Sequence, residues 1–422
     1  MGNIIDYARE ERHSFEELPF NEVDALVLAQ LAYEDIPTLV PDLDDEQKTY
    51  GTPLARLRNF RLDRRHVGRS VKALFRTPFS PITLKQMDEV LHGGADIACQ
   101  HQVHAVNFTD PAITHSFVRT VADNPRFSGL RVGAFAERFD AEEQTQTAAL
   151  TFLLPDGTLV LSFRGTDDSL VGWKEDFNMS VRCPVPSQTQ AVEYFRSIEE
   201  RTSSPFAAAP RIHVGGHSKG GNLAVYTAMK AKSEHIGRVF SHDGPGFMRE
   251  VTASEDFRAI EPIVEKTVPE ASVIGMLMST VNEYTIVETN VSGIMQHMGL
   301  NWRIEDGDFI TKPELSPKAR LLDRTLDAWM EQFTDRERAQ AVDQCYDIIA
   351  SAGYRVIPPN LRIISATRCP SSPRRSDRPY EVDAQPHHQH PQSASRHGRA
   401  IAVRTVQPLR RTGREIHGGR RR

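Results

Sequence analysis

The chain has 422 residues, of which 39% are hydrophobic, and a formal net charge of −5. This supplies enough apolar material for a large core, and an α/β fold of such length can be a single unit. Residues 366–422 hold 13 Arg, no Lys and 4 acidic residues, a local charge of +9, so the preceding body carries about −14. An acidic body does not suggest a nucleic-acid-binding protein. Four scattered cysteines suggest neither a disulfide framework nor a zinc site.

The beginning of the chain carries no recognisable targeting signal. The first residues lack the basic region and the long apolar region of a signal peptide, and Asp6 stands where myristoylation needs Ser or Thr. No apolar run approaches the roughly 18 residues that a membrane-spanning helix needs. We therefore expect a cytoplasmic protein.

The first part of the chain, residues 1–129, is expected to be a helical segment that packs on a larger core. Asn21 can cap a helix that runs to Asp35, because apolar residues recur there at helical spacing. Cys99, His101 and His104 lie close together in the sequence. Since no fourth ligand stands near them, we expect no metal site.

A basic stretch occupies residues 49–76 of this first part. Its one acidic residue is Asp63, and its basic residues are Arg56, Arg58, Arg61, Arg64, Arg65, Arg69, Lys72 and Arg76. A solvated loop or helix face is the simpler interpretation. Contact with an anionic surface, such as a membrane or a phosphorylated substrate, is the alternative.

The second part, residues 130–357, alternates β-type and helical patterns. Strands are expected at residues 130–139, 147–154, 158–163, 212–214, 238–242 and 283–289, and helices at 187–201, 219–232, 255–266 and 320–352. Pro155-Asp156-Gly157 predicts a hairpin turn, and Thr334 with Glu337 predicts a capping box. Residues 272–278 are apolar without a clear assignment. The alternation predicts an α/β fold with a mainly parallel sheet flanked by helices.

The third part, residues 358–422, is rich in Pro, Ser, His and Arg and has no apolar periodicity. Such a segment cannot bury enough apolar area to become ordered, so we expect a disordered basic tail. It is either an interaction tail or, because it lacks Lys and is unlike the body, a reading-frame artefact.

A glycine-rich turn around Ser218 is the central motif of the chain. Gly216-His217-Ser218-Lys219-Gly220 fits the G-x-S-x-G nucleophile elbow, which raises a serine hydroxyl at a sharp strand-to-helix turn. Glycines are needed where the turn brings the backbone close to a neighbouring strand and helix. His217 would be turned away from the nucleophile and is expected to be a packing residue.

A second informative stretch, residues 162–176, reads SFRGTDDSLVGWKED. In acyl transfer, backbone N–H groups must point at the developing oxyanion, one from the residue after the nucleophile and one from an earlier strand-end loop. Lys219 and Thr166 occupy these two positions. Arg164 and Asp176 are expected to form a buried pair that fixes the loop, and Trp173 is expected to be a packing residue.

Together, FRGTDDSLVGWKEDFN and GGHSKGGNLAVY resemble the class 3 (fungal-type) lipase pattern. With DGPGF, SVIGML and the QH segment near the end, the chain is more similar to a bacterial branch of that lipase-like α/β-hydrolase group, whose substrates are undefined. The resemblance covers about residues 15–355. It implies an α/β-hydrolase fold and serine esterase chemistry. We therefore expect a hydrolase core with an N-terminal helical, basic extension, and a reaction without metal or cofactor.

A serine nucleophile needs a general base, and the base needs an acid to orient it. His297 is the last histidine of the folded part after Ser218, where this fold places its base. Asp243 ends the strand that follows the elbow helix and is the first candidate acid. The lipase pattern puts its acid one strand later, where no Asp stands, so Glu270, Glu283 and Glu288 remain alternatives.

The sequence thus predicts a serine hydrolase that cleaves a carboxylic ester, with a lipid or other acyl ester as the substrate class implied by the resemblance. Ser218 is the expected nucleophile, His297 the base and Asp243 the acid. Two alternatives remain. One is a binding protein that keeps the fold without catalysis, and the other is a membrane-associated protein that acts through its basic segments. No nucleic-acid partner is expected.

Overall fold

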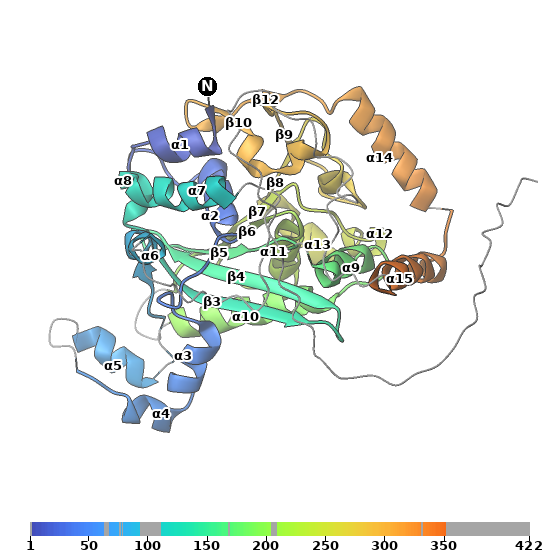
Figure 1. Cartoon of the computed structure of the whole chain (residues 1–422). Helices are drawn as coiled ribbons and strands as arrows, with labels where there is room; N and C mark the ends of the chain where they lie inside the picture. The colour runs from blue at the N-terminus through green and yellow to red at the C-terminus, as the bar shows by residue number, and fades with distance from the viewer. Residues whose placement is uncertain are drawn as a thin grey trace, which may run out of the picture. The chain divides into compact units, whose positions relative to one another are not determined.

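The computed structural model describes residues 2–62, 67–75, 77, 79–92, 111–167, 169–203, 209–330 and 332–351 (Figure 1). The chain divides into two units, residues 1–367 and 368–422, and every element below belongs to the first. Cys99, His101, His104 and the expected tail from residue 358 lie outside the described residues. The boundaries proposed at residues 129 and 357 remain predictions.

The described strands form one large and one small sheet. The strands are β1 (Gly2–Asn3), β2 (Ile82–Thr83), β3 (Arg131–Asp140), β4 (Thr145–Leu153), β5 (Leu159–Phe163), β6 (Ile212–His217), β7 (Ile236–His242), β8 (Val264–Pro269), β9 (Thr285–Val287), β10 (Arg303–Glu305), β11 (Asp308–Phe309) and β12 (Thr311–Lys312). The large sheet has the order β12-β9-β8-β7-β6-β5-β4-β3-β2, and the small one the order β1-β10-β11.

The helices flank this sheet. The α-helices are α1 (Ile4–Glu10), α2 (Glu22–Leu31), α3 (Leu43–Tyr50), α4 (Pro53–Arg58), α5 (Val67–Phe75), α6 (Leu84–Leu91), α7 (Pro111–Asp123), α8 (Pro125–Ser128), α9 (Leu170–Asn178), α10 (Pro186–Thr202), α11 (Lys219–Ala231), α12 (Arg249–Thr252), α13 (Glu255–Ile260), α14 (Pro317–Met330) and α15 (Asp335–Ser351). Short 3-10 helices are η1 (Glu261–Ile263), η2 (Ile274–Met276), η3 (Gly293–His297) and η4 (Gly299–Asn301).

The large sheet is mixed. Strands β5 to β9 are parallel to one another, whereas β2, β3 and β4 on one side and β12 on the other pair antiparallel. The predicted hairpin joins β4 and β5, and Gly157 adopts a positive φ of 89° in its turn. The α/β class and its helical layers are therefore confirmed, although the antiparallel strands β2–β4 make the sheet less uniformly parallel than expected.

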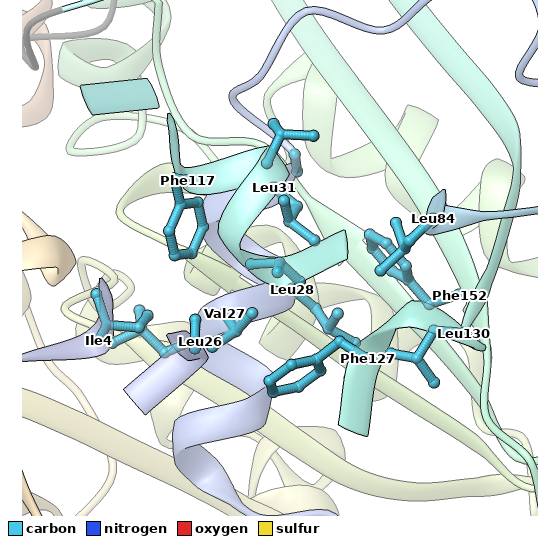
Figure 2. Close-up of a cluster of buried hydrophobic side chains, with 14 of the residues drawn as sticks. Ile4, Leu26, Val27, Leu28, Leu31, Leu84, Phe117, Phe127, Leu130 and Phe152 are labelled. Atoms are coloured by element: carbon cyan, nitrogen blue, oxygen red, sulfur yellow. The ribbon is translucent and has the colours of Figure 1, made fainter. Parts of the chain in front are cut away.

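Two apolar clusters cover the two faces of the sheet. Because successive side chains of a strand point to opposite faces, Leu150 and Phe152 of β4 enter one cluster and Ala149 enters the other. Helices α1, α2, α7 and α8 contribute to the first cluster (Figure 2), and α10 and α11 to the second. The N-terminal helices are thus part of the core.

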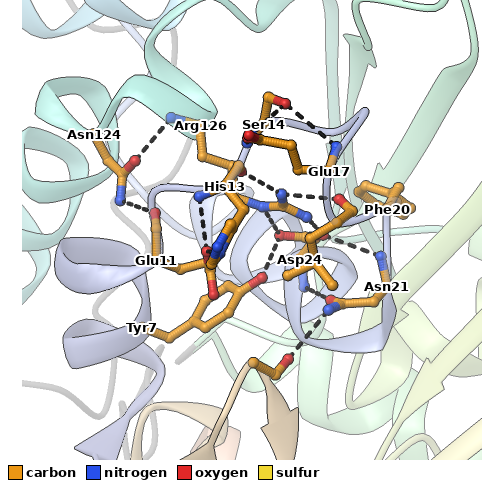
Figure 3. Close-up of polar contacts among 12 residues, drawn as sticks. Tyr7, Glu11, His13, Ser14, Glu17, Phe20, Asn21, Asp24, Asn124 and Arg126 are labelled. Carbon is orange, nitrogen blue, oxygen red and sulfur yellow. Dashed lines mark hydrogen bonds and ion pairs between the residues drawn. The ribbon is translucent and has the colours of Figure 1, made fainter.

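A buried ion pair holds the N-terminal helices together (Figure 3). The Arg126 guanidinium donates from Nη2 to Oδ2 of Asp24 at 2.5 Å and from Nε to Oδ1 at 2.9 Å. The Tyr7 hydroxyl donates to Oδ1 of the same carboxylate at 2.8 Å. Asn21 caps α2 as predicted, with Asp24 completing a capping box.

One expected helix, residues 255–266, is wrong in its second half. Helix α13 ends at Ile260, and residues from Val264 form strand β8. Pro262 lacks a backbone N–H and so cannot continue the helical hydrogen bonds. The parallel pairing of β8 with β7 and β9 then decides its extended conformation. The capping box of Thr334 and Glu337 is confirmed.

Candidate active site

Ser218 lies at the sharp turn between strand β6 and helix α11. It has φ 57° and ψ −133°, a backbone conformation that a side-chain-bearing residue rarely adopts. A Cβ at Gly216 would lie 2.5 Å from the carbonyl oxygen of Phe163, and one at Gly220 would lie 2.0 Å from the same oxygen. The two glycines are therefore required because the turn passes directly against β5, as the sequence predicts.

The residues on either side of Ser218 link the turn to the neighbouring strand and to the predicted base. The Ser218 amide donates to the carbonyl of His242, the last residue of β7, at 2.9 Å. His217 is buried, its Nε2 lies 2.6 Å from the carbonyl oxygen of His297, and the two imidazole rings are 4.6 Å apart. Burial lowers the pKa of His217 to about 3, so its imidazole is neutral.

His297 and Asp243 form a hydrogen-bonded pair beside this turn. Nδ1 of His297 lies 2.6 Å from Oδ2 of Asp243. The carboxylate is fully buried, whereas 18% of the His297 side chain is exposed. An imidazole with one nitrogen on a buried carboxylate keeps its other nitrogen available for proton transfer.

The second carboxylate oxygen of Asp243 is held by the loop after β8. The Ser272 hydroxyl donates to Oδ1 at 2.5 Å and the Gly275 amide at 3.1 Å. Asp243 itself adopts a positive φ of 48° at the end of β7. Both oxygens are therefore satisfied, so the carboxylate has one fixed orientation toward His297.

Lys266 on β8 joins the two loops that surround Asp243. Its buried Nζ donates to the carbonyls of Gly244 at 2.9 Å and Gly275 at 2.6 Å, and to the Thr280 hydroxyl at 2.6 Å. Burial lowers its pKa to about 8, although the nearby Asp243 favours the charged form. A single ammonium group thus ties the loop that carries Asp243 to the loop that hydrogen-bonds it.

The three alternative carboxylates lie elsewhere. Glu288 forms ion pairs with Arg303 at 2.5 Å and Lys312 at 3.1 Å. Glu283 is exposed. Glu270 directly follows β8, and its backbone bonds to Val287 and Ser316. Of the four candidates, Asp243 is the one that the structure brings to His297.

The segment before α9 lies next to the serine. A Cβ at Gly165 would be 3.1 Å from Cβ of Ser218. The hydroxyl of the following residue, Thr166, donates to Oδ2 of Asp176 at 2.5 Å. Burial raises the pKa of Asp176 to about 6, against the opposing effect of nearby Lys219. The side chain of Thr166 is therefore fixed by Asp176. Its backbone N–H comes directly after Gly165, the residue that lies against Ser218.

The expected pair between Arg164 and Asp176 is wrong. Nη2 of Arg164 lies 2.6 Å from Oε1 of Glu137, and both side chains are buried. Glu137 belongs to β3, two strands away in the sheet but distant in sequence, so spacing along the chain gave no sign of it. Trp173 contacts the ring of Phe177, with centroids 6.4 Å apart.

Lys219 has a buried side chain with a specific partner. Its Nζ donates to the carbonyl of Gln146 at 2.8 Å and to Oε2 of Glu175 at 3.2 Å. Glu175 also accepts the backbone N–H groups of Gln146 and Ser187. Lys219 is the first residue of α11, so its backbone N–H has no hydrogen-bond acceptor within the helix.

Tyr33 is a site residue that sequence reasoning missed. Its hydroxyl accepts the Gly165 N–H at 3.0 Å and lies 3.2 Å from both Nδ1 and the carbonyl oxygen of His217. It follows α2, so the N-terminal segment reaches the elbow directly. A lone tyrosine at the end of an apolar helix carries no signal of this contact. Sequence reasoning also missed Lys266, Ser272 and Glu175, because the fold creates their contacts and the neighbouring residues carry no sign of them.

Among the described residues, no group of three or more His, Cys, Asp or Glu side chains is arranged to hold a metal ion. In the same part of the chain, no helix combines the length and apolar character needed to cross a membrane.

The model of the Mbeg1-like family matches residues 121–347, which is more than half of the chain and includes every residue of the elbow and of the histidine–aspartate pair. The chain belongs to the Mbeg1-like family. Among solved structures, this Mbeg1-like protein is similar to M37 lipase, with 13% sequence identity and a TM-score of 0.28 over 53% of this chain and 76% of that chain. A likeness at that TM-score carries no argument about function. No curated protein matches the chain.

Proposed function

We propose that this Mbeg1-like protein has an α/β-hydrolase fold and is a serine hydrolase that cleaves a carboxylic ester through an acyl-enzyme. The observation that carries the proposal is the hydrogen-bonded pair of the buried Asp243 and the half-buried His297, 2.6 Å between Oδ2 and Nδ1, beside the strained turn at Ser218. Strained backbone is retained where function requires it, and a serine with a histidine–carboxylate pair is the usual means of activating a hydroxyl.

In the first half of the proposed reaction, Ser218 Oγ attacks the ester carbonyl carbon while Nε2 of His297 takes the hydroxyl proton. The carbonyl oxygen becomes an oxyanion, which accepts hydrogen bonds from the backbone N–H groups of Lys219 and Thr166. The C–O bond to the leaving group then breaks, and the departing alkoxide takes the proton from His297. Asp243 keeps the imidazole in the required tautomer and stabilises the imidazolium.

In the second half, water replaces the alcohol. Nε2 of His297 removes a proton from water, whose oxygen attacks the acyl carbon, and the collapse of the second tetrahedral intermediate returns that proton to Ser218 Oγ. The products are a carboxylic acid and an alcohol. A lipid or other acyl ester is the proposed substrate class, and it rests on the resemblance of the FRGT and GHSKGG segments to lipases. These steps need neither a metal nor a cofactor.

The test compares wild type with Ser218→Ala in the hydrolysis of p-nitrophenyl esters of increasing acyl length. We expect the variant to lose essentially all turnover while its circular dichroism and thermal midpoint stay close to those of wild type. Equal rates for the two proteins contradict the mechanism. A folded wild type without turnover, which also resists a fluorophosphonate, supports the competing function of a non-catalytic binding protein.

A further inference from the structure

Helices α4 and α5 expose apolar side chains to an unusual degree. Of the eleven large hydrophobic residues that are exposed in the described part of the chain, six lie within residues 54–75. Their exposed fractions are 77% for Leu54, 65% for Leu57, 55% for Leu62, 50% for Val67, 44% for Val71 and 71% for Phe75. On α4, Leu54 and Leu57 are three positions apart, and on α5, Val67, Val71 and Phe75 are four apart, so each helix exposes an apolar face. Exposed apolar surface gathered in one short segment marks an interaction site. We call residues 53–62 and 67–75 the α4–α5 lobe.

Two polar side chains of the lobe, those of Arg56 and Asn59, hydrogen-bond to backbone carbonyls of the lobe and of α3. The half-buried Arg56 donates from Nε to the carbonyl of Leu74 at 3.2 Å, and from Nη1 to the carbonyls of Tyr50 and Gly51 at 3.0 and 3.2 Å. Asn59 donates to the carbonyl of Thr49 at 3.0 Å. These bonds hold two helices that are too short to be stable alone. The lobe therefore exposes Leu54, Leu57 and Leu62 on a scaffold that Arg56 stabilises.

The lobe is attached to the body through α3. Arg201 of α10 donates from Nη1 to Oε2 of Glu46 at 2.8 Å and from Nη2 to the carbonyl of Leu43 at 3.0 Å. Figure 1 shows α3, α4 and α5 together at the lower left, outside the helices that cover the sheet. The exposed apolar residues thus lie at the periphery of the fold, and the buried ion pair of Arg201 with Glu46 attaches their segment to the body.

The charge of the lobe favours an anionic membrane as its partner. Arg58 and Arg61 are exposed beside the leucines. Residues 49–76 contain eight basic residues and one acidic residue, whereas the chain before residue 366 as a whole carries about −14. Exposed apolar side chains and exposed arginines in the same segment suit the boundary between the headgroups and the acyl chains of an anionic bilayer. The acidic body would be repelled by the same bilayer, which favours docking by the lobe alone.

We infer that the α4–α5 lobe docks this protein on anionic lipid membranes, with Leu54, Leu57 and Phe75 inserted among the acyl chains and Arg58 and Arg61 at the headgroups. This inference does not depend on catalysis by Ser218. Membrane docking would be a function of the lobe, separate from the chemistry at Ser218.

The test uses the full-length protein and vesicles of phosphatidylcholine, with and without phosphatidylglycerol, in a flotation assay. Because each leucine and arginine removed weakens insertion, we expect Leu54→Asp/Leu57→Asp and Arg58→Glu/Arg61→Glu each to lower partitioning onto anionic vesicles by about tenfold or more. Leu321→Asp/Leu322→Asp on α14 alters two other exposed leucines and should bind as wild type does. Circular dichroism checks that all variants fold.

A tryptophan reporter separates the lobe from the arginine-rich tail. In Leu57→Trp, vesicles should shift the added fluorescence to the blue and brominated acyl chains should quench it, and Leu321→Trp should show neither effect. Vesicle binding without quenching at position 57 would mean that the tail binds and the inference is wrong. It is equally wrong if Leu57→Trp is already blue-shifted without lipid and the protein sediments as a dimer, since a second copy then covers the lobe.

Discussion

Oδ2 of Asp243 lies 2.6 Å from Nδ1 of His297, although the two residues are 54 positions apart in the chain. The first directly follows β7 and the second lies in η3, beyond two further strands. Their contact, beside the turn that holds Ser218, is the relationship on which the proposed chemistry depends.

Asp243→Asn should reduce ester turnover sharply without unfolding the protein. The amide keeps the shape of the carboxylate but favours the wrong imidazole tautomer and cannot stabilise an imidazolium, so we expect kcat to fall by about 10³- to 10⁴-fold. Steady-state kinetics on a p-nitrophenyl ester measures this. Glu270→Gln, the matched control, should retain wild-type turnover. A larger loss in the control than in Asp243→Asn would assign the acid to Glu270.

Gly220→Ala tests the geometry of the elbow. The added Cβ would lie 2.0 Å from a backbone oxygen of Phe163, which cannot move without shifting β5. We expect a loss of about 1–3 kcal/mol or more in the free energy of unfolding, although alanine is the better helix former. Chemical denaturation measures it. Gly129→Ala, which meets nothing within 4 Å, should change stability by much less. Similar stability losses in both variants would contradict the close approach of α11 and β5.

Lys219→Met separates the backbone of Lys219 from its side chain. The methionine leaves the buried carboxylate of Glu175 without its ammonium partner, which we expect to cost about 3–5 kcal/mol of stability. The backbone N–H stays in place, so kcat measured well below the unfolding midpoint should change little. Loss of kcat in a variant of unchanged stability would place the ammonium in the reaction, against the proposed oxyanion role of the backbone.

Lys266→Met should act on turnover and on the pH dependence of stability. Without the ammonium, the carbonyls of Gly244 and Gly275 lose their donor and the hydrogen bonds to Asp243 loosen. We therefore expect kcat to fall while KM changes little, as for a positioning residue.

The pH dependence follows from the lowered pKa of Lys266. In the folded state it is about 8, below the ordinary 10.5, so the unfolded chain binds more protons between these values. Wild-type stability should therefore rise by about 3 kcal/mol relative to Lys266→Met as the pH increases from about 8 to 10.5. Denaturation of both proteins across this range measures the difference. A difference that stays constant with pH would show that folding does not lower the pKa of Lys266.

The sequence predicts features that depend on local chemistry. The glycines around Ser218 and the turn at Pro155-Asp156-Gly157 were identified because a tight backbone demands particular residues. The helix expected at residues 255–266 overlaps the first three residues of β8, whose extended conformation is decided by pairing with β7 and β9. Pairing across the fold is not predictable from the local sequence: spacing favours Asp176 as the partner of Arg164, whereas the sheet places Glu137 against it.

The same distinction holds within the site. The strand-end position favours Asp243 as the acid, yet the residues around it do not exclude Glu270, and the contact with His297 appears only in the folded chain. Tyr33 and Lys266 were missed because each acts through carbonyl or amide groups far along the chain. Such contacts leave no pattern in the residues that surround them.

Fluorophosphonate labelling followed by peptide mass spectrometry tests the nucleophilic serine most directly. The account predicts a single phosphonyl adduct on Ser218 in the wild-type protein, none in Ser218→Ala, and much slower labelling in His297→Ala, which lacks the base. A wild-type protein that is folded by circular dichroism and stays unlabelled at Ser218, or that is labelled equally fast without His297, would contradict it.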